Sequence, residues 1–289
     1  MADSAIVPGP DAEPPHLLRE TVIRPTKGWR SLNLGELYLY RDLMTFLAWR
    51  DLKVRYQQTL LGGAWAILQP LATMIVFTFV FGKLAKLPSD GVPYPLFSLT
   101  ALVIWTYFSQ SLTATVTSLI NNTQLVEKVY FPRLILPMSS TIRGLADLAV
   151  AFAFLLLVLA FYGVWPTWQA LAVIPFTLLA VIATIGIGSG LAAINVRFRD
   201  VRQMMPLLIQ LWLFATPVAY PASMAPAEWR ALLGLNPMAG VVEGYRWALL
   251  NTGPFPLELV AISTASALVM LVVGLAIFRR IENSFADII

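Results

Sequence analysis

Five long segments of this sequence contain no aspartate, glutamate, lysine or arginine: residues 56–82, 91–126, 148–196, 203–227 and 259–278. About 20 helical residues cross the roughly 30 Å hydrocarbon core of a bilayer, so each segment is long enough to span it. Hydrophobic residues make up 58% of the chain and charged residues 12%, whereas soluble domains contain about 45–50% and about 25%. The sequence therefore predicts an all-α integral membrane protein.

Turn signals divide the uncharged segments into six predicted transmembrane helices. The segment 148–196 is long enough for two of them, and residues 163–168, with Pro166 between two tryptophans, mark the break. Together the six helices form a transmembrane domain over residues 63–289. The predicted spans are 63–82, 97–120, 134–162, 169–195, 204–220 and 257–278.

The part of the chain before the first span is predicted to hold two different segments. Residues 1–31 are polar and rich in proline and glycine, which predicts a mobile cytoplasmic leader. In residues 32–62, leucine and phenylalanine recur at helical spacing among cations, which predicts an amphipathic helix in the membrane interface. A cytoplasmic helix packed on a partner is the alternative. The cations expected at the membrane surface are Arg50, Lys53 and Arg55.

Residues 221–256, between the fifth and sixth spans, are apolar but interrupted by prolines. Such backbone is tolerated at membrane depth only where protein or a water-filled cavity surrounds it. We therefore expect a re-entrant pair of short helices here, with an interfacial surface loop as the alternative.

Lysine and arginine near the span ends predict the orientation of the chain. The side that carries the N-terminus holds Arg41, Arg50, Lys53, Arg55, Lys128, Arg133, Arg143, Arg197, Arg199, Arg202, Arg279 and Arg280. The opposite side holds only Lys83, Lys86, Arg230 and Arg246. By the positive-inside rule, both termini are expected in the cytoplasm. The net charge of +4 is thus attributed to membrane orientation, and no nucleic-acid partner is expected.

Residues that carry catalytic or metal chemistry are scarce. The chain has no cysteine and one histidine, so we expect no metal site, and no catalytic set of side chains stands out. It also lacks a G-x-x-x-x-G-K-[ST] loop for ATP phosphates. Gly186 and Gly190 form a G-x-x-x-G pattern, which favours close helix packing. We expect that this chain is not an enzyme and binds no cofactor.

One acidic residue, Asp147, falls within a predicted span, four residues after Arg143. This spacing places the two side chains on one helix face, where they can form an ion pair. An intramembrane carboxylate is a candidate functional group, but Arg143 lies near the cytoplasmic end of the span. We therefore predict a structural ion pair.

Several segments together resemble the type-2 ABC exporter permeases for O-antigen, capsule and teichoic-acid polymers. They are WRDLKVRYQQTLLG at 49–62 with Trp65 and Gln69-Pro70, EKVYFP at 127–132 with Pro137, NVRFRDV at 195–201, TPVAY at 216–220, and Asn236-Pro237. The resemblance runs from about residue 22 to the C-terminus. It implies a homodimer in the cytoplasmic (inner) membrane, bound to two copies of a separate ATPase that holds ATP and Mg²⁺. It also implies that a lipid-linked polysaccharide passes between the permease subunits.

Two sets of residues are candidates for this activity. Aromatic side chains in the spans could line a path for sugars, with anchoring at the headgroups as the alternative: Trp105, Tyr107, Phe108, Trp212, Phe214 and Tyr220. Residues 121–133 are predicted to form an amphipathic coupling helix for the ATPase, capped by Asn122 or Thr123 and ended before Pro132. Its central residues are Leu125, Val126, Glu127, Lys128, Val129 and Tyr130. A plain interfacial loop is the alternative.

Three rival functions remain open from the sequence. The first is a type-2 exporter of a drug or small lipid, and the second is a polytopic membrane glycosyltransferase, which would need paired carboxylates at a membrane face. The third is a membrane scaffold without transport.

Overall fold

The computed structural model describes residues 34–57, 62–282 and 285, and these residues form helices and connecting segments without any strand. The described residues from Gly35 onward make up one compact unit. The predicted leader, residues 1–31, lies outside the described part of the chain. The N-terminal helices are α1 (Leu34–Leu39) and α2 (Arg41–Gln57).

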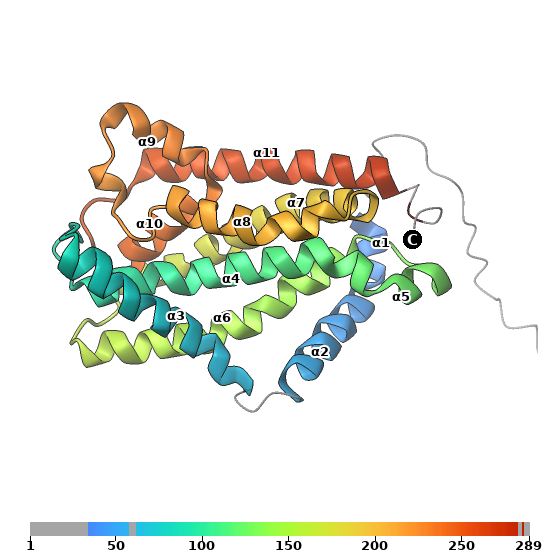
Figure 1. Ribbon diagram of the computed structural model, residues 1–289, viewed down its shortest axis with the longest axis horizontal. Coiled ribbons are helices and arrows are strands. Elements are labelled where there is room, and N and C mark those ends of the chain that lie inside the picture. The colour runs from blue at the N-terminus through green and yellow to red at the C-terminus, as the bar shows by residue number, and fades with distance from the viewer. Residues whose placement is uncertain (1–33, 58–61, 283–284, 286–289) are drawn as a thin grey trace, which may run out of the picture. The chain divides into compact units, whose positions relative to one another are not determined.

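The remaining helices follow one another along the chain with short connections (Figure 1). In order they are η2 (Gly62–Ala64), α3 (Trp65–Phe77), η3 (Thr78–Leu84), α4 (Tyr94–Asn121), α5 (Thr123–Lys128), α6 (Ile135–Phe161), η4 (Trp168–Ala172), α7 (Val173–Arg197), α8 (Asp200–Ala215), η5 (Ala222–Met224), α9 (Ala227–Gly234), α10 (Pro237–Leu250) and α11 (Leu257–Glu282). Here η3 is a π-helical continuation of α3.

Helix α4 is the central helix of the bundle. It packs against α3, α6, α7, α8 and α10, and most of its side chains are buried. Its buried hydroxyls return hydrogen bonds to their own helix; for example, Ser98 Oγ donates to Tyr94 O over 2.9 Å and Thr100 Oγ1 donates to Leu96 O over 2.8 Å. Because other helices surround α4, it tolerates serine and threonine that a lipid-facing helix would avoid.

Four helices in the described residues are long and apolar enough to cross a membrane: Gly62–Leu84, Ile135–Phe161, Trp168–Arg197 and Leu257–Glu282. They coincide with four of the six expected spans. The other two, α4 and α8, do not meet the same measure, because α4 is rich in hydroxyls and α8 has only 16 residues. The helix expected over residues 204–220 ends earlier, at Ala215, since Thr216 before Pro217 is extended.

The segment between α8 and α11 contains two short helices, α9 and α10, as the proline spacing predicted. Asn236 separates them and caps α10, with its Oδ1 accepting a hydrogen bond from Met238 N over 3.0 Å. Asn251 ends α10 in the left-handed conformation, with φ of 53°. Helix α10 is buried along most of its length, whereas α9 packs mainly against α11.

Helices α7 and α11 cross at glycines, which confirms the packing role expected for the G-x-x-x-G pattern. A Cβ on Gly186 would lie 2.5 Å from the Cα of Leu271, and one on Gly190 would lie 3.0 Å from the Cα of Gly274. A Cβ on Gly274 would lie 1.8 Å from the carbonyl oxygen of Gly186. The two backbones approach this closely only because no side chain separates them.

Replacing Gly274 with leucine is therefore expected to force α7 and α11 apart. Overpacking of a tight contact costs about 1–3 kcal/mol, so the variant should lose its monodisperse elution at a lower temperature than the wild type in a heating series. Ala265→Leu is the matched control, because Ala265 lies on the same helix and is exposed. Equal heat resistance of G274L and A265L would contradict the proposed role of the crossing.

Candidate functional site

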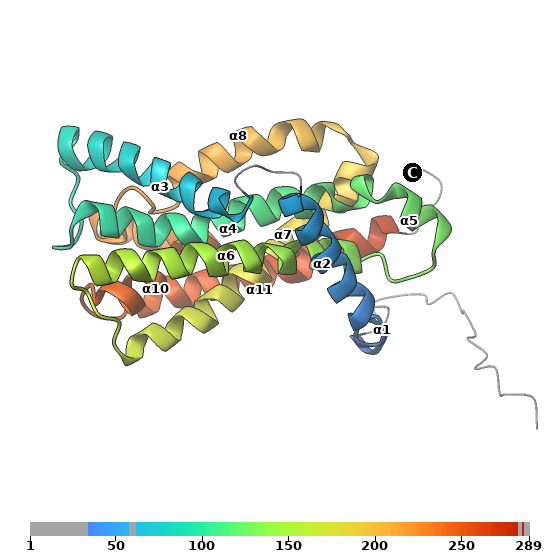
Figure 2. The same ribbon diagram turned by 90° about the horizontal axis from the view of Figure 1, so that it is seen from below.

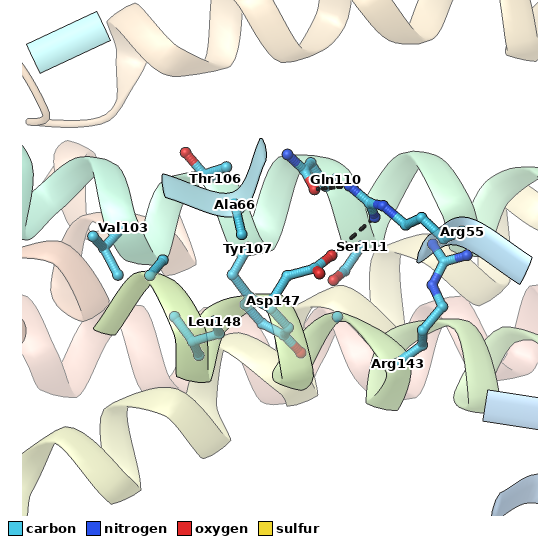
Figure 3. Close-up of a pocket in the computed structure, with 12 residues that line it drawn as sticks. Arg55, Ala66, Val103, Thr106, Tyr107, Gln110, Ser111, Arg143, Asp147 and Leu148 are labelled. Carbon is cyan, nitrogen blue, oxygen red and sulfur yellow. Dashed lines mark hydrogen bonds and ion pairs between the residues drawn. The ribbon is translucent and has the colours of Figure 1, made fainter. Parts of the chain in front are cut away.

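A polar network joins α2 to the helices of the bundle (Figure 3). Arg55 Nη1 lies 2.9 Å from Asp147 Oδ2 of α6, and Arg55 Nη2 donates to Gln110 Oε1 of α4 over 3.0 Å. Gln110 in turn donates to Gln69 Oε1 of α3 over 2.7 Å. Tyr56 OH also donates to Asp147, and burial together with this hydrogen bond raises the pKa of Tyr56 to about 12. Tyr56 therefore keeps its proton and remains a donor at physiological pH.

The ion pair that we expected between Arg143 and Asp147 is replaced by the pair between Arg55 and Asp147. Side chains on a helix lean toward its N-terminus, so Arg143 extends away from Asp147 and toward Arg55 (Figure 3). Among the described residues, Arg143 forms no ion pair within 4.0 Å, and its Nε is buried without a hydrogen-bond partner. The sequence pattern could not reveal this exchange, because the competing cation lies on another helix.

The cations of α2 do not share one environment. Arg50 contacts Asp51 at 2.7 Å and donates to Asn122 Oδ1 at the end of α4 over 2.8 Å, whereas Lys53 is exposed. Two of the three expected interfacial cations, Arg50 and Arg55, thus make contacts within the protein. Apolar side chains of α2 are exposed as well: Phe46, Trp49 and Val54 are 63%, 65% and 60% exposed.

Removing the carboxylate of Asp147 is expected to loosen α2 from the bundle. Asp147→Asn leaves Arg55 without its anionic partner, and hydrogen bonds to charged groups contribute about 1.5–3 kcal/mol, reduced here because Arg55 is partly exposed. Amide hydrogen exchange over residues 41–57 should accelerate several-fold while exchange in α4 stays slow. Asp42→Asn is the control, since the Asp42 side chain is 94% exposed. Equal amide exchange rates over residues 41–57 in the two variants would show that Asp147 does not anchor α2.

The aromatic residues expected to line a path occupy two different environments. Trp105, Tyr107 and Phe108 are only 4%, 3% and 0% exposed, so in this chain they pack between helices and contribute no open surface. These three residues point to different sides of α4, and all three are buried because other helices surround α4. Of the six expected path residues, only Trp212, Phe214 and Tyr220 are partly or fully exposed, and the path itself stays a prediction.

The segment around Asn236 fixes the C-terminal end of α8. Trp212 Nε1 donates to Asn236 Oδ1 over 2.9 Å, and Asn236 Nδ2 donates to Thr216 Oγ1 over 2.8 Å. The ring of Trp212 also meets Phe108 edge-on, with 5.2 Å between the centroids. Trp212 is therefore held in one orientation beside the exposed face of α8.

The expected coupling segment forms a shorter helix than the pattern predicted. Helix α5 ends at Lys128, and Val129 is already extended, with φ of −126° and ψ of 132°. Asn122 occupies the N-cap position, but its side chain does not cap the helix and instead bonds to Arg50 and Ser118.

The apolar residues of this segment are divided between the core and the surface. Val126 is buried, whereas Val129 and Tyr130 are 50% and 63% exposed. Leu125 is partly buried, and Glu127 and Lys128 are exposed. The result is a segment with two adjacent exposed apolar side chains directly after α5.

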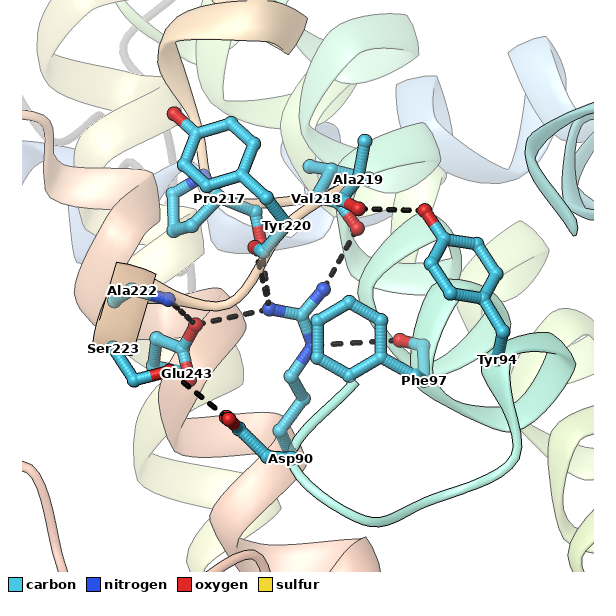
Figure 4. A network of polar contacts seen from close by, with 11 residues as sticks. Asp90, Tyr94, Phe97, Pro217, Val218, Ala219, Tyr220, Ala222, Ser223 and Glu243 are labelled. Atoms are coloured by element: carbon cyan, nitrogen blue, oxygen red, sulfur yellow. Dashed lines mark hydrogen bonds and ion pairs between the residues drawn. The ribbon is translucent and has the colours of Figure 1, made fainter. Parts of the chain in front are cut away.

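A second network, which the sequence did not indicate, centres on the fully buried Arg246 of α10 (Figure 4). Its Nη1 donates to Pro217 O over 2.6 Å and its Nη2 donates to Val218 O over 2.7 Å. The guanidinium also lies over the ring of Phe97, 3.5 Å from the centroid. Arg246 thus holds the irregular segment after α8 against α4.

Glu243 completes this network from one turn earlier on α10. Its Oε1 accepts from Arg246 Nη1 over 2.9 Å and from Ala222 N over 2.9 Å. Tyr94 OH adds a bond of 2.6 Å to Ala219 O on the other side of the segment. These contacts satisfy backbone groups that would otherwise be buried without partners. By sequence, Arg246 counts among the cations near the span ends, whereas the structure buries it completely.

Comparison with known proteins identifies the family. The sequence profile of the ABC-2 type transporter family matches residues 42–250. The chain belongs to this family. The matched region of this ABC-2 transporter begins in α2 and ends with α10, so it includes both polar networks.

This ABC-2 transporter matches curated relatives over nearly their whole length. The O-antigen export system permease protein RfbA from Klebsiella pneumoniae is 32% identical over 89% of this chain and 97% of its own. The protein of the same name from Myxococcus xanthus is 32% identical over 87% and 97%. The polysialic acid transport protein KpsM from Escherichia coli is 25% identical over 81% and 92%. The family and the apolar helices together make this chain a multi-pass membrane protein.

Proposed function

We propose that this chain is the permease subunit of an ATP-driven exporter that moves lipid-linked polysaccharide, such as O-antigen or capsular polymer, across the cytoplasmic membrane. The observation that carries the proposal is the 32% identity to O-antigen export permeases over 97% of their length. These relatives and the polysialic acid transport protein also favour a polysaccharide over a drug or small lipid. A glycosyltransferase or scaffold function has no comparable support.

The proposed assembly is a homodimer of this chain with two copies of a separate ATPase, which would bind ATP and Mg²⁺. The unpartnered apolar face of the bundle supports a second copy, since α3 and α8 both lie on one side of α4 (Figure 2). The exposed residues along α8 follow helical spacing: Met204, Leu207, Leu211 and Phe214. Polymer would pass along this face, beside Trp212, Phe214 and Tyr220.

The membrane arrangement proposed for the chain has six spans and both termini in the cytoplasm. Helix α4 has 28 residues, which is about 42 Å at 1.5 Å per residue, and the surrounding helices would shield its hydroxyls from lipid. Helix α8 is shorter, and the segment held by Arg246 would complete its crossing. Helices α9 and α10 would form the re-entrant pair, because α10 is buried along most of its length and α9 packs against α11.

Deletion of the gene tests the proposed function directly. Cells without the chain should accumulate lipid-linked polymer inside the cytoplasmic membrane and lose it from their surface, and a plasmid copy should restore display. Polymer can be followed by surface labelling and by extraction of the lipid-linked fraction. Unchanged surface polymer in the deletion strain would contradict the proposal.

The purified chain alone is expected to hydrolyse no ATP, because its sequence has no P-loop for the phosphates. Turnover should appear only when the ATPase subunit is added, and a P-loop lysine variant of that subunit should abolish it. Phosphate release measured on both preparations decides the point. Sustained hydrolysis by a preparation proven free of other subunits would show that ATP acts on this chain itself.

A further inference from the structure

A groove of about 800 Å³ lies between α2, α4, α5 and α6. Arg50 and Arg55 of α2 and Arg143 of α6 line it, together with polar side chains that include Thr117 and Asn121 of α4. Such a volume accommodates a ligand of several tens of atoms, in the usual range for small-molecule sites. The groove is separate from the aromatic residues assigned to the polymer path.

The charges around the groove do not balance. Asp51 is paired with Arg50 at 2.7 Å, and Asp147 is paired with Arg55 at 2.9 Å. Arg143 is the third guanidinium, and within the described residues no carboxylate lies within ion-pair distance of it. Its Nε is buried and lacks a hydrogen-bond partner. Three arginines and one carboxylate, Asp51, line the groove, so the site is suited to an anion supplied by a ligand.

Guanidinium groups favour phosphate oxygens, because their planar N–H fork matches the spacing of two acceptors on one phosphorus. The groove also adjoins an apolar surface, since Val54 lines it and is 60% exposed. Phe46 and Trp49 extend the exposed apolar face along α2. A cationic groove beside an apolar face fits an amphiphile better than a free ion.

We propose that this groove binds the phosphate group of an anionic lipid, with Arg143 contacting the phosphate and the hydrocarbon chain lying along the exposed face of α2. The inference deepens the proposed function and rests on it for its biological meaning, because a polymer carried on a lipid phosphate would bind here before transport. The binding itself is testable without any export.

The test uses the full-length chain in detergent micelles and equilibrium dialysis with radiolabelled farnesyl diphosphate. Arg143→Gln should weaken binding about tenfold to a hundredfold, as expected for the loss of a charged hydrogen-bond donor. Arg143→Lys keeps the positive charge but lacks the planar N–H fork, so its affinity should lie between those of the wild type and Arg143→Gln. Arg199→Gln is the matched control, because Arg199 is an exposed cation outside the groove, and it should bind like the wild type.

Competition distinguishes the sources of the phosphate. Displacement of the label by unlabelled farnesyl diphosphate, but weakly by phosphatidylglycerol, would assign the site to a prenyl carrier lipid. Comparable displacement by phosphatidylglycerol would assign it to membrane phospholipid, and both results support the site. Inorganic pyrophosphate binding as tightly as farnesyl diphosphate would overturn the role of the apolar face.

Two further results would overturn the proposal. One is unchanged binding by R143Q, and the other is an equal loss in R143Q and R199Q, which would indicate bulk charge alone. Should R143Q fail to elute as a folded protein, Asn121→Trp provides a second variant that fills the groove from an exposed position and should block binding. The two proposals can fail separately. If the chain binds the labelled lipid phosphate but deletion of its gene leaves surface polymer unchanged, the proposed function is rejected and the binding site is retained.

Discussion

Replacing Arg246 with methionine is expected to destabilise the chain by about 3–5 kcal/mol, the usual cost of removing one partner of a buried ion pair. Methionine retains much of the side-chain volume but donates no hydrogen bond. Glu243 would then be left buried without its cation, and the carbonyls of Pro217 and Val218 would lose donors at 2.6 Å and 2.7 Å. The folded yield from membranes and the midpoint of thermal unfolding should both fall sharply.

Arg230→Met is the matched control for the loss of a cation from the same region of the chain. Arg230 lies on α9 and is exposed, and its guanidinium Nε donates to Ala225 O over 3.3 Å. Adding Glu243→Gln to the Arg246 variant should recover part of the lost stability, because the unpaired charge is then removed. A yield and midpoint for R246M equal to those of R230M would show that the buried network is dispensable.

The helices were predictable because exclusion of charge from lipid leaves a direct mark in the sequence. The spans at Ile135–Phe161 and Leu257–Glu282 were expected at 134–162 and 257–278. This signal is weaker where a helix is surrounded by protein and not by lipid, because polar residues are then tolerated: α4 carries buried serines and threonines. The end of α8 was misplaced because apolar composition continues beyond the residue before Pro217, where the backbone leaves the helix.

The polar networks were harder to predict, because their partners are distant in the chain. Spacing of four residues suggested that Asp147 pairs with Arg143, but Arg55, from another helix, occupies that position. Arg246 was read as a cation near a membrane surface, yet it is fully buried against Phe97 and the segment after α8. Local patterns identify which residues share a helix face, and only the tertiary packing decides which charges meet.

The largest functional effect is expected when Val129 and Tyr130 are both replaced by aspartate. These two side chains are 50% and 63% exposed directly after α5, so the change should leave folding and membrane insertion intact. An apolar contact with the proposed ATPase would then hold two unpaired carboxylates, and their desolvation costs several kcal/mol. Capture of the ATPase during purification and export of polymer should therefore fall together by at least tenfold.

Two controls separate coupling from a general loss of surface apolarity. Val129→Ala with Tyr130→Phe keeps the contact apolar and should retain most capture and export. Phe198→Asp places a carboxylate at another exposed aromatic, 56% exposed between α7 and α8, and should affect capture less if the contact is centred on α5. Because α5 directly links α4 to α6, movement of the ATPase against this segment would be transmitted to two helices of the bundle. Normal ATPase capture together with wild-type export in the double aspartate variant would place the coupling contact elsewhere on the chain.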